Sequence, residues 1–209
     1  MKFGYKILIG VASAGLITWG FIALHRRMSK VGSKISCNSK FLFIGDSTTA
    51  GASSYADKLK ENCPDISIKK LAKSGEKTDW MLDQFNEEIK TGVKYDVITI
   101  LGMSNDIFAR QSIDKTKVNL QAMYDKAKQM GAKVVAITAP NKSFYSATKE
   151  IHRTLINELT DWIKNNKSVD VFIDLGAMSS DQKLFASDNQ HLNGTGHEML
   201  KNEFVKKVL

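Results

Sequence analysis

Short apolar runs alternate with longer stretches of helical spacing along most of this 209-residue chain. The apolar runs are rich in Ile, Val and Phe and too short for helices, so they predict strands over 41–45, 66–72, 95–102, 132–139 and 169–175. The stretches between and after them predict helices over 53–62, 77–91, 113–130, 146–166 and 194–208. Strict alternation implies right-handed crossovers and a parallel sheet covered on both faces. We therefore predict one α/β domain, a three-layer α/β/α fold with a five-stranded parallel sheet in flavodoxin-like order.

An apolar segment precedes this domain. Residues 7–24, ILIGVASAGLITWGFIAL, carry no charge and would form a helix about 27 Å long, just enough to cross the hydrocarbon core of a bilayer. A buried globular helix and a cleavable signal peptide are the alternatives, but HRRMSK follows in place of a small-residue cleavage site. We therefore predict an uncleaved transmembrane anchor at 7–24, after a short basic N-terminus at 1–6. A basic polar linker at 25–40 then leads to the α/β domain at 41–209.

The positive charge of the chain is concentrated before that domain. The formal net charge is +8, yet no acidic residue occurs before Asp46. Seven of the 30 Lys and Arg residues precede Asp46, which leaves 23 basic against 22 acidic residues in the rest of the chain. The seven are Lys2, Lys6, Arg26, Arg27, Lys30, Lys34 and Lys40. The domain itself is nearly neutral, so we predict no nucleic-acid partner.

The charges on either side of the apolar segment determine its orientation only weakly. The positive-inside rule compares Lys2, Lys6 and the α-amine on one side with four basic residues on the other, namely Arg26, Arg27, Lys30 and Lys34. The two sides are nearly tied, with a slight bias towards a cytoplasmic domain.

The two cysteines favour the opposite orientation. Cys37 lies four residues before the first predicted strand, and Cys63 lies three residues before the second. These strands are neighbours in the predicted order, about 4.8 Å apart, so both cysteines reach the same edge of the sheet at a spacing that a disulfide can bridge. Two unrelated thiols are the alternative. A disulfide between Cys37 and Cys63 would imply an oxidising compartment, so we predict an extracytoplasmic domain, with the cytoplasmic face as the alternative.

Polar loops follow the predicted strands at their carboxyl ends, where open parallel sheets bind their ligands. They contain GDSTTAG after the first strand, KSGEKT after the second, GMSNDIF after the third and SDNQHLN after the fifth. A serine hydroxyl becomes a nucleophile when a base takes its proton and a third group orients that base. Ser47 is the candidate nucleophile and His191 the candidate base, with Asp188 near enough in sequence to orient it. The backbone N–H groups of Ser47 and Gly75 and the side-chain amide of Asn105 are candidate donors of an oxyanion hole.

These loops resemble the four sequence blocks of the SGNH (GDSL-type) hydrolases. FIGDSTTAG resembles the first block of that family, SGEKT the second, LGMSNDI the third and DNQHLN the last, in order over about residues 41–208. The resemblance implies a serine ester hydrolase with Ser47, Asp188 and His191 as catalytic residues and Ser47, Gly75 and Asn105 as the oxyanion hole. One departure is that Met103 stands where the third block usually has glycine. A shift of this loop would weaken the Asn105 donor.

Each of these residues also has an ordinary structural explanation. Ser47 is a typical helix N-cap after a strand, and Gly75 suits a turn. Asn105 with its neighbour Asp106 would suit a helix cap. Among the other histidines, His197 is expected on the surface of the last helix, and His152 and His25 do not cluster with cysteines as in a zinc site. We predict no metal and no nucleotide cofactor.

The predicted function is a membrane-anchored serine esterase that hydrolyses acyl esters through an acyl-serine intermediate. The range of the family covers O-acetyl groups on carbohydrates, lysophospholipids and thioesters, and an anchored enzyme suggests acyl or O-acetyl esters of an envelope glycan or lipid. One alternative is an acyltransferase that uses the same serine. Another is a catalytically impaired domain that serves an envelope or virion assembly, which the departure at Met103 leaves open. The sequence does not indicate an oligomeric state.

Overall fold

The computed structural model describes residues 35–141 and 143–209. The predicted anchor at 7–24, the basic N-terminus and the first part of the linker lie outside the described residues. Within the part of the chain that is described, no helix is long and apolar enough to cross a membrane. Residues Ile35–Leu209 form one unit.

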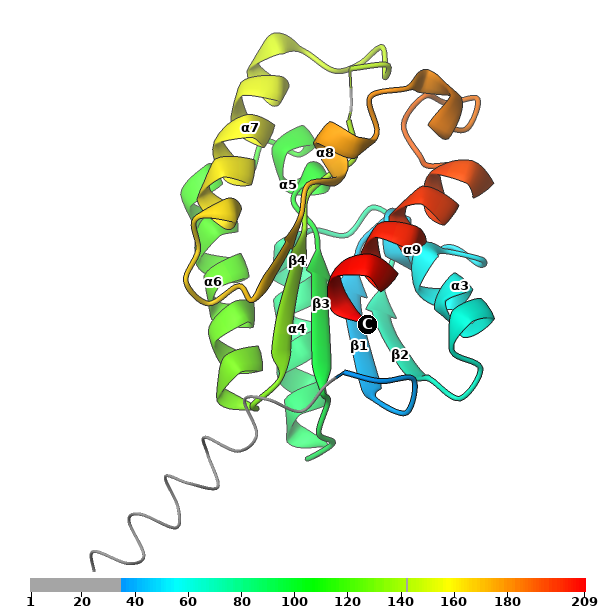
Figure 1. Ribbon diagram of the computed structural model, residues 1–209. Helices are drawn as coiled ribbons and strands as arrows, with labels where there is room; N and C mark the ends of the chain where they lie inside the picture. Colours follow the sequence, from blue (N-terminus) through cyan, green and yellow to red (C-terminus); the bar gives the residue numbers. More distant parts are fainter. Residues whose placement is uncertain (1–34, 142) are drawn as a thin grey trace, which may run out of the picture. The chain divides into compact units, whose positions relative to one another are not determined.

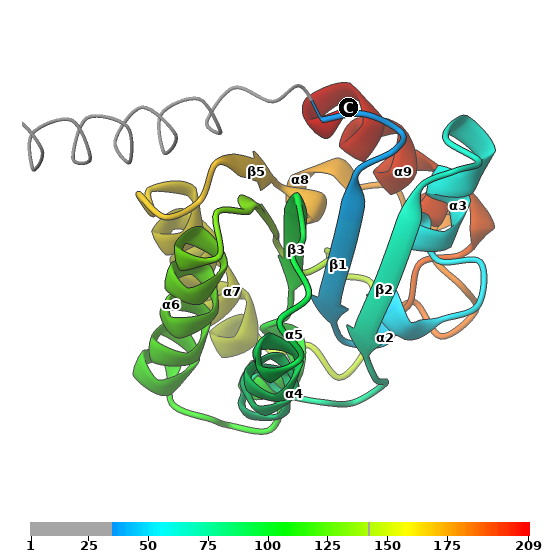
Figure 2. The ribbon, with the colours of Figure 1, turned by 90° about the horizontal axis from the view of Figure 1, so that it is seen from below.

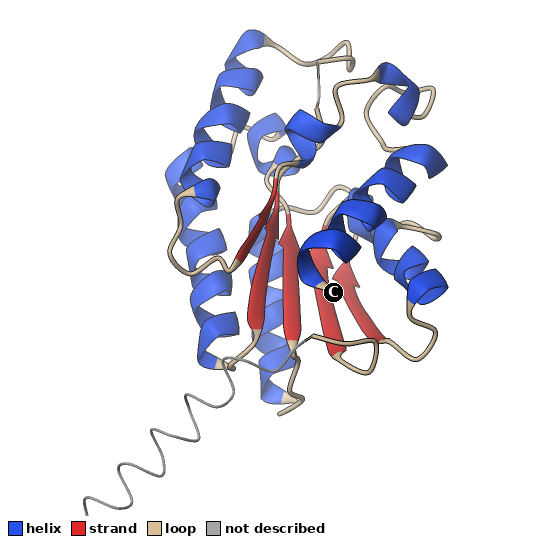
Figure 3. Ribbon diagram, viewed as in Figure 1, coloured by secondary structure: helices blue, strands red, loops and turns tan. Residues whose placement is uncertain are grey.

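Five parallel strands form the sheet, in the order β2-β1-β3-β4-β5 (Figures 1 and 3). The strands are β1 (Lys40–Gly45), β2 (Ser67–Ala72), β3 (Val97–Leu101), β4 (Lys133–Ile137) and β5 (Val171–Ile173). This confirms the predicted five-stranded, flavodoxin-like sheet. The chain passes from β1 to β2 on one side and then crosses to β3 on the other side of β1. The strand order therefore reverses between β1 and β3. Loops after these two strands diverge there and leave room for a site.

Helices cover both faces of the sheet (Figure 2). One face carries the helices α4 (Thr78–Lys90), α6 (Ile113–Gln129) and α7 (Glu150–Lys164). The other carries α3 (Tyr55–Asn62) and α9 (Gly194–Val208). Short helical turns follow the strands or precede α9: α2 (Ser47–Ala50), α5 (Ser104–Phe108), α8 (Leu175–Met178) and the 3-10 turn η1 (Gln182–Leu184). The predicted three-layer fold is thereby confirmed.

Alternate residues of β1 supply the two hydrophobic cores. Phe41 and Phe43 pack with α3 and α9, and the ring of Phe43 lies 5.6 Å from that of Phe204 on α9. Leu42 and Ile44 point the opposite way and pack with α4 and α6. These four side chains are completely buried. A strand buried on both faces reads as a continuous apolar run, which is why FLFIG is recognisable in the sequence.

The fifth strand is shorter than the predicted 169–175, and side chains at both of its ends account for the difference. The Asp170 carboxylate accepts the backbone N–H of Val134 at 2.8 Å, just before the strand begins. The Asp174 carboxylate accepts the N–H of Ala177 at 3.0 Å and so caps α8. Short polar side chains compete with the sheet for backbone hydrogen bonds, and β5 is therefore confined to the residues between Asp170 and Asp174.

A disulfide joins Cys37 and Cys63, with their Cα atoms 4.9 Å apart. Cys37 precedes β1 and is exposed, whereas Cys63 follows α3 and is buried. The parallel register pairs Lys40 with Ser67, so both cysteines lie at the amino ends of their strands. The disulfide therefore closes a loop that contains β1, α2 and α3. It lies at the amino ends of the strands, opposite to the carboxyl end of β1.

Candidate active site

Ser47 lies immediately beyond the carboxyl end of β1, as the first residue of α2. The N-cap of α2 is Asp46, whose carboxylate accepts the N–H of Thr48 at 2.9 Å. Asp46 thus takes the capping role that the sequence also allowed for Ser47, and the Ser47 hydroxyl is left for another partner. The turn is tight, because a Cβ on Gly45 would lie 2.3 Å from the Thr49 hydroxyl. Glycine at 45 therefore allows the chain to turn directly from the strand into the helix that presents Ser47.

His191 and Asp188 form a hydrogen-bonded chain with Ser47. The Nε2 atom of His191 lies 3.1 Å from Ser47 Oγ, and its Nδ1 atom lies 2.6 Å from Asp188 Oδ2. Burial alone would raise the pKa of Asp188, but hydrogen bonds from the ring and backbone of His191 and the backbone of Gln190 lower it to about 2. An ionised Asp188 can only accept a hydrogen bond, so the proton of the neutral ring sits on Nδ1 and Nε2 can accept from Ser47.

The loop that carries His191 is fixed by backbone and side-chain hydrogen bonds. The N–H of Ala186 donates to the carbonyl of His191 at 2.8 Å, inside a short antiparallel bridge between Phe185 and Leu192. The Asn193 amide donates to the carbonyls of Lys183 and Phe185 at 2.7 and 2.9 Å. The other side-chain atom of Asn193 caps α9 by accepting from Gly196 at 3.0 Å. The loop is therefore tied to the start of a long helix, which orients the ring of His191.

The candidate oxyanion donors come from three neighbouring loops. The N–H of Ser47 belongs to the first turn of α2, where amide groups have no partner within the helix. Gly75 has φ +79°, a conformation that favours glycine, in the turn between β2 and α4. The Asn105 amide lies in the first turn of α5 and donates one hydrogen bond to the Glu76 carbonyl at 2.8 Å. That bond uses one of its two amide protons and links Asn105 to the residue after Gly75.

Met103, the departure in the third sequence block, is accommodated in the core. Its side chain is 1% exposed and packs with the cluster beneath α4 and α6. Gly102 takes part in a different close contact, because a Cβ at this position would lie 2.5 Å from the sulfur of Met81 on α4. The glycine one place earlier than usual thus leaves room for the end of the Met81 side chain, and Asn105 lies in the first turn of α5.

Two other histidines have structural contacts. His197 was expected on the surface, but it is half-buried and its Nδ1 atom accepts the N–H of Tyr55 at 3.3 Å, at the start of α3. Burial lowers the pKa of His197, and nearby Lys58 lowers it further. His152 lies in the first turn of α7, with its ring 4.6 Å from that of Phe108. The sequence held no local signal for the His197 contact, because its partner lies 142 residues away.

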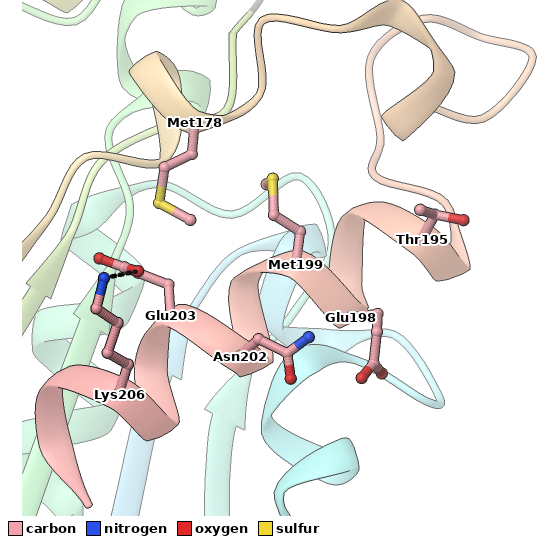
Figure 4. Close-up of a pocket in the computed structure, with 7 residues that line it drawn as sticks. All are labelled: Met178, Thr195, Glu198, Met199, Asn202, Glu203 and Lys206. Carbon is pink, nitrogen blue, oxygen red and sulfur yellow. Dashed lines mark ion pairs between the residues drawn. The ribbon is translucent and has the colours of Figure 1, made fainter.

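An open groove between α8 and α9 is distinct from these residues (Figure 4). Met178 and Met199 face one another across it, and Glu203 and Lys206 form an ion pair of 4.0 Å on its rim. None of the three residues of the hydrogen-bonded chain lines this groove. Among the residues that line this groove, none forms a hydrogen-bonded pair of nucleophile and base like that of Ser47 and His191.

Comparison with known proteins places the chain in a family. The GDSL-like lipase/acylhydrolase family matches residues 43–199, three quarters of the chain, and the chain belongs to it. The predicted class, a serine ester hydrolase of the SGNH/GDSL type, is thereby confirmed. No curated protein sequence matches the chain.

Solved structures share the fold at low sequence identity. The lipase/acylhydrolase from Enterococcus faecalis is 21% identical, with a TM-score of 0.67 over 80% of this chain and 94% of that chain. A catalytic mutant of Axe2, an acetylxylan esterase from Geobacillus stearothermophilus, is 17% identical, with a TM-score of 0.69 over 84% of this chain and 96% of that chain. The lipase Lip_vut3 from a goat rumen metagenome is 20% identical, with a TM-score of 0.67 over 80% and 96%. These likenesses establish the fold.

Proposed function

We propose that the domain hydrolyses acyl esters through an acyl-serine intermediate, with Ser47 as nucleophile, His191 as base and Asp188 as its orienting partner. The single observation that carries the proposal is the continuous chain of 3.1 Å and 2.6 Å from Ser47 Oγ through the His191 ring to the Asp188 carboxylate. Serine, base and orienting carboxylate in this geometry are what acyl transfer to a hydroxyl requires.

The first half of the reaction forms the acyl-enzyme. Ser47 Oγ attacks the ester carbonyl carbon while its proton passes to His191 Nε2, and the carbonyl electrons move onto oxygen. The N–H groups of Ser47 and Gly75 and the Asn105 amide receive this oxyanion. When the tetrahedral species collapses, the alcohol oxygen leaves with the proton held by His191.

The second half releases the acid. A water molecule loses a proton to His191 Nε2 and attacks the acyl carbon, which forms a second oxyanion at the same donors. Collapse expels Ser47 Oγ, which recovers the proton from the imidazolium. Asp188 stays ionised throughout, which stabilises the charged ring in both halves.

Hydrolysis is favoured over transfer to another hydroxyl by the exposure of the site. The side chains of His191 and Asp188 are 42% and 47% exposed, so water has access to the base when the acyl-enzyme is present. An acyltransferase with the same serine is the alternative, and it would need an acceptor that excludes this water. The third hypothesis, a catalytically impaired structural domain, has no support from this site, because Ser47, His191 and Asp188 form the complete hydrogen-bonded chain.

The substrate we propose is an acyl ester, including an O-acetyl ester, of an envelope glycan or lipid. Support comes from the apolar segment at 7–24, which would hold the enzyme at a membrane. Further support comes from the acetylxylan esterase among the proteins that share the fold. We also propose an extracytoplasmic domain on a single-pass anchor, supported by the disulfide between Cys37 and Cys63, because disulfides persist in oxidising compartments.

Turnover of short esters tests the proposed function. The protein beginning at residue 35 is incubated with p-nitrophenyl acetate, beside the variants Ser47→Ala and Ser180→Ala. Ser180 is an exposed serine outside the site and serves as the matched control. We expect hydrolysis by the wild type and by Ser180→Ala and its loss in Ser47→Ala. Equal turnover by Ser47→Ala would refute the assignment of the nucleophile.

A further inference from the structure

Asp106, the residue after Asn105, is a completely buried carboxylate at the contact between α4, α5 and α6. The N–H of Thr78 donates to both of its oxygens at 3.2 Å, and the Thr78 hydroxyl forms a further short hydrogen bond to it. The Gln111 amide donates at 2.6 Å and the Thr116 hydroxyl at 3.3 Å. Burial raises the pKa of Asp106, and the hydrogen bonds from Thr78 and Thr116 act against that rise. A cluster this well satisfied fixes the elements that contribute to it.

Asp106 also performs a task that α4 cannot perform for itself. The N-cap residue of α4 is Lys77, which makes no side-chain capping bond. The first N–H of the helix, that of Thr78, is instead received by Asp106 from α5, 28 residues away. The start of α4 is therefore capped by the segment that carries Asn105, and the two elements are joined at their first turns.

Two consecutive side chains of α5 hold one short stretch of the α4 loop. The Asn105 amide binds the carbonyl of Glu76 at 2.8 Å, and the Asp106 carboxylate binds the N–H of Thr78. Gly75, whose N–H is the second candidate oxyanion donor, directly precedes Glu76. The stretch 76–78 is thus held at both ends, by Asn105 and by Asp106. These two consecutive residues of α5 therefore fix the position of Gly75 relative to the Asn105 amide.

We propose that Asp106 is the positioning residue of the oxyanion hole. By capping α4 from α5, Asp106 fixes the position of the Gly75 N–H relative to the Asn105 amide. This inference rests on the proposed esterase function. Oxyanion donors act only when they already point to where charge develops, so a small displacement of the 75–78 loop lowers the rate without changing ground-state binding. Asp106 itself touches neither substrate nor Ser47 in this role.

Substitutions separate positioning from mere stability. Asp106→Asn retains the shape of the side chain but replaces one of its two acceptor oxygens with an N–H donor. Thr78→Val removes the hydroxyl of that contact, and Thr78→Ser retains it. Thr116→Val is the matched control, because its hydroxyl also reaches Asp106 from a buried position but belongs to α6, away from the 75–78 loop.

The readouts are kcat and KM for p-nitrophenyl acetate, and the affinity for a trifluoromethyl ketone that forms a tetrahedral adduct with serine. We expect Asp106→Asn to lower kcat by about 10–100-fold with KM within about threefold, since complete loss of one donor typically costs about 10²–10³ in kcat. The affinity for the ketone should fall by the same factor as kcat. Thr78→Val should lower both in the same direction, while Thr78→Ser and Thr116→Val stay within about threefold of the wild type.

Three results would overturn the inference. One is an active wild type whose kcat is unchanged in a folded Asp106→Asn variant. Another, which decides the case if Asp106→Asn does not fold, is a Thr78→Val variant with wild-type kcat and ketone affinity. A third is an equal loss of kcat in Thr116→Val, which would mean a general structural role. A wild type that hydrolyses no ester would instead refute the proposed function, and this inference with it.

Discussion

The disulfide between Cys37 and Cys63 leads to a quantitative prediction about stability. It closes a loop with a sequence separation of 26 residues, within which Ser47 lies. In the chain-entropy description, cross-linking a loop of this length removes about 12 cal/mol/K from the unfolded state, or about 3.5 kcal/mol at 25 °C. Unfolding entropy near the midpoint is about 2.1 cal/mol/K per residue, so the unit Ile35–Leu209 has about 0.37 kcal/mol/K in total. Opening the disulfide should therefore lower Tm by about 9–10 °C.

The variant Cys37→Ser isolates this effect. Cys37 is exposed, whereas Cys63 is 3% exposed and packs in the core, so the substitution opens the cross-link without removing buried apolar surface. Thermal melts followed by circular dichroism should show the lower Tm in Cys37→Ser, and the same Tm for the wild type in a thiol reductant. The reductant should not change the variant further. A Tm within about 3 °C of the wild type would refute the reasoning, because it would mean that the cross-link does not restrict the unfolded chain.

Three further predictions concern the site and the core. Asp188→Asn should fold normally and lose up to about 10⁴ in kcat/KM, because the ring of His191 is no longer held in the required tautomer; activity within threefold of the wild type would return Asp188 to the role of a turn residue. Because the pKa of Asp188 is held at about 2, its carboxylate stays ionised above that pH and should add no protonation step of its own to the acid limb of log kcat/KM; a slope of two down to about pH 4 would contradict this. Phe204→Ala should lower the free energy of unfolding by about 3–5 kcal/mol in urea denaturation, because Phe204 is completely buried against Phe43 and Tyr55; a loss below about 1 kcal/mol would contradict the packing.

The layers and strand order of the fold could be predicted because they depend on patterns that span whole elements. Runs such as FLFIG are apolar on both faces, which only a covered parallel sheet explains, and the crossover rule then leaves few topologies. The ends of elements could not be predicted as well, because they depend on single side chains. The carboxylates of Asp170 and Asp174 shorten β5, and Asp46 takes the capping role at α2 that the sequence equally allowed for Ser47.

The candidate site could be predicted where its residues follow the carboxyl ends of strands. Ser47 and His191 are 144 residues apart, yet both follow strands whose carboxyl ends share one edge, and the structure brings them within hydrogen-bond distance. The cap that Asp106 provides for α4 could not be foreseen. Asp106 and Thr78 lie 28 residues apart, and nothing in the local sequence around Thr78 shows that its helix lacks a cap of its own.

Covalent labelling shows whether Ser47 is a nucleophile that His191 activates. The protein beginning at residue 35 is treated with a fluorophosphonate, digested, and analysed by mass spectrometry for the modified serine. We expect labelling at Ser47, its disappearance in Ser47→Ala and a sharp fall in His191→Ala, with Ser180→Ala labelled like the wild type. Labelling at another serine, or labelling of Ser47 that does not depend on His191, would contradict it.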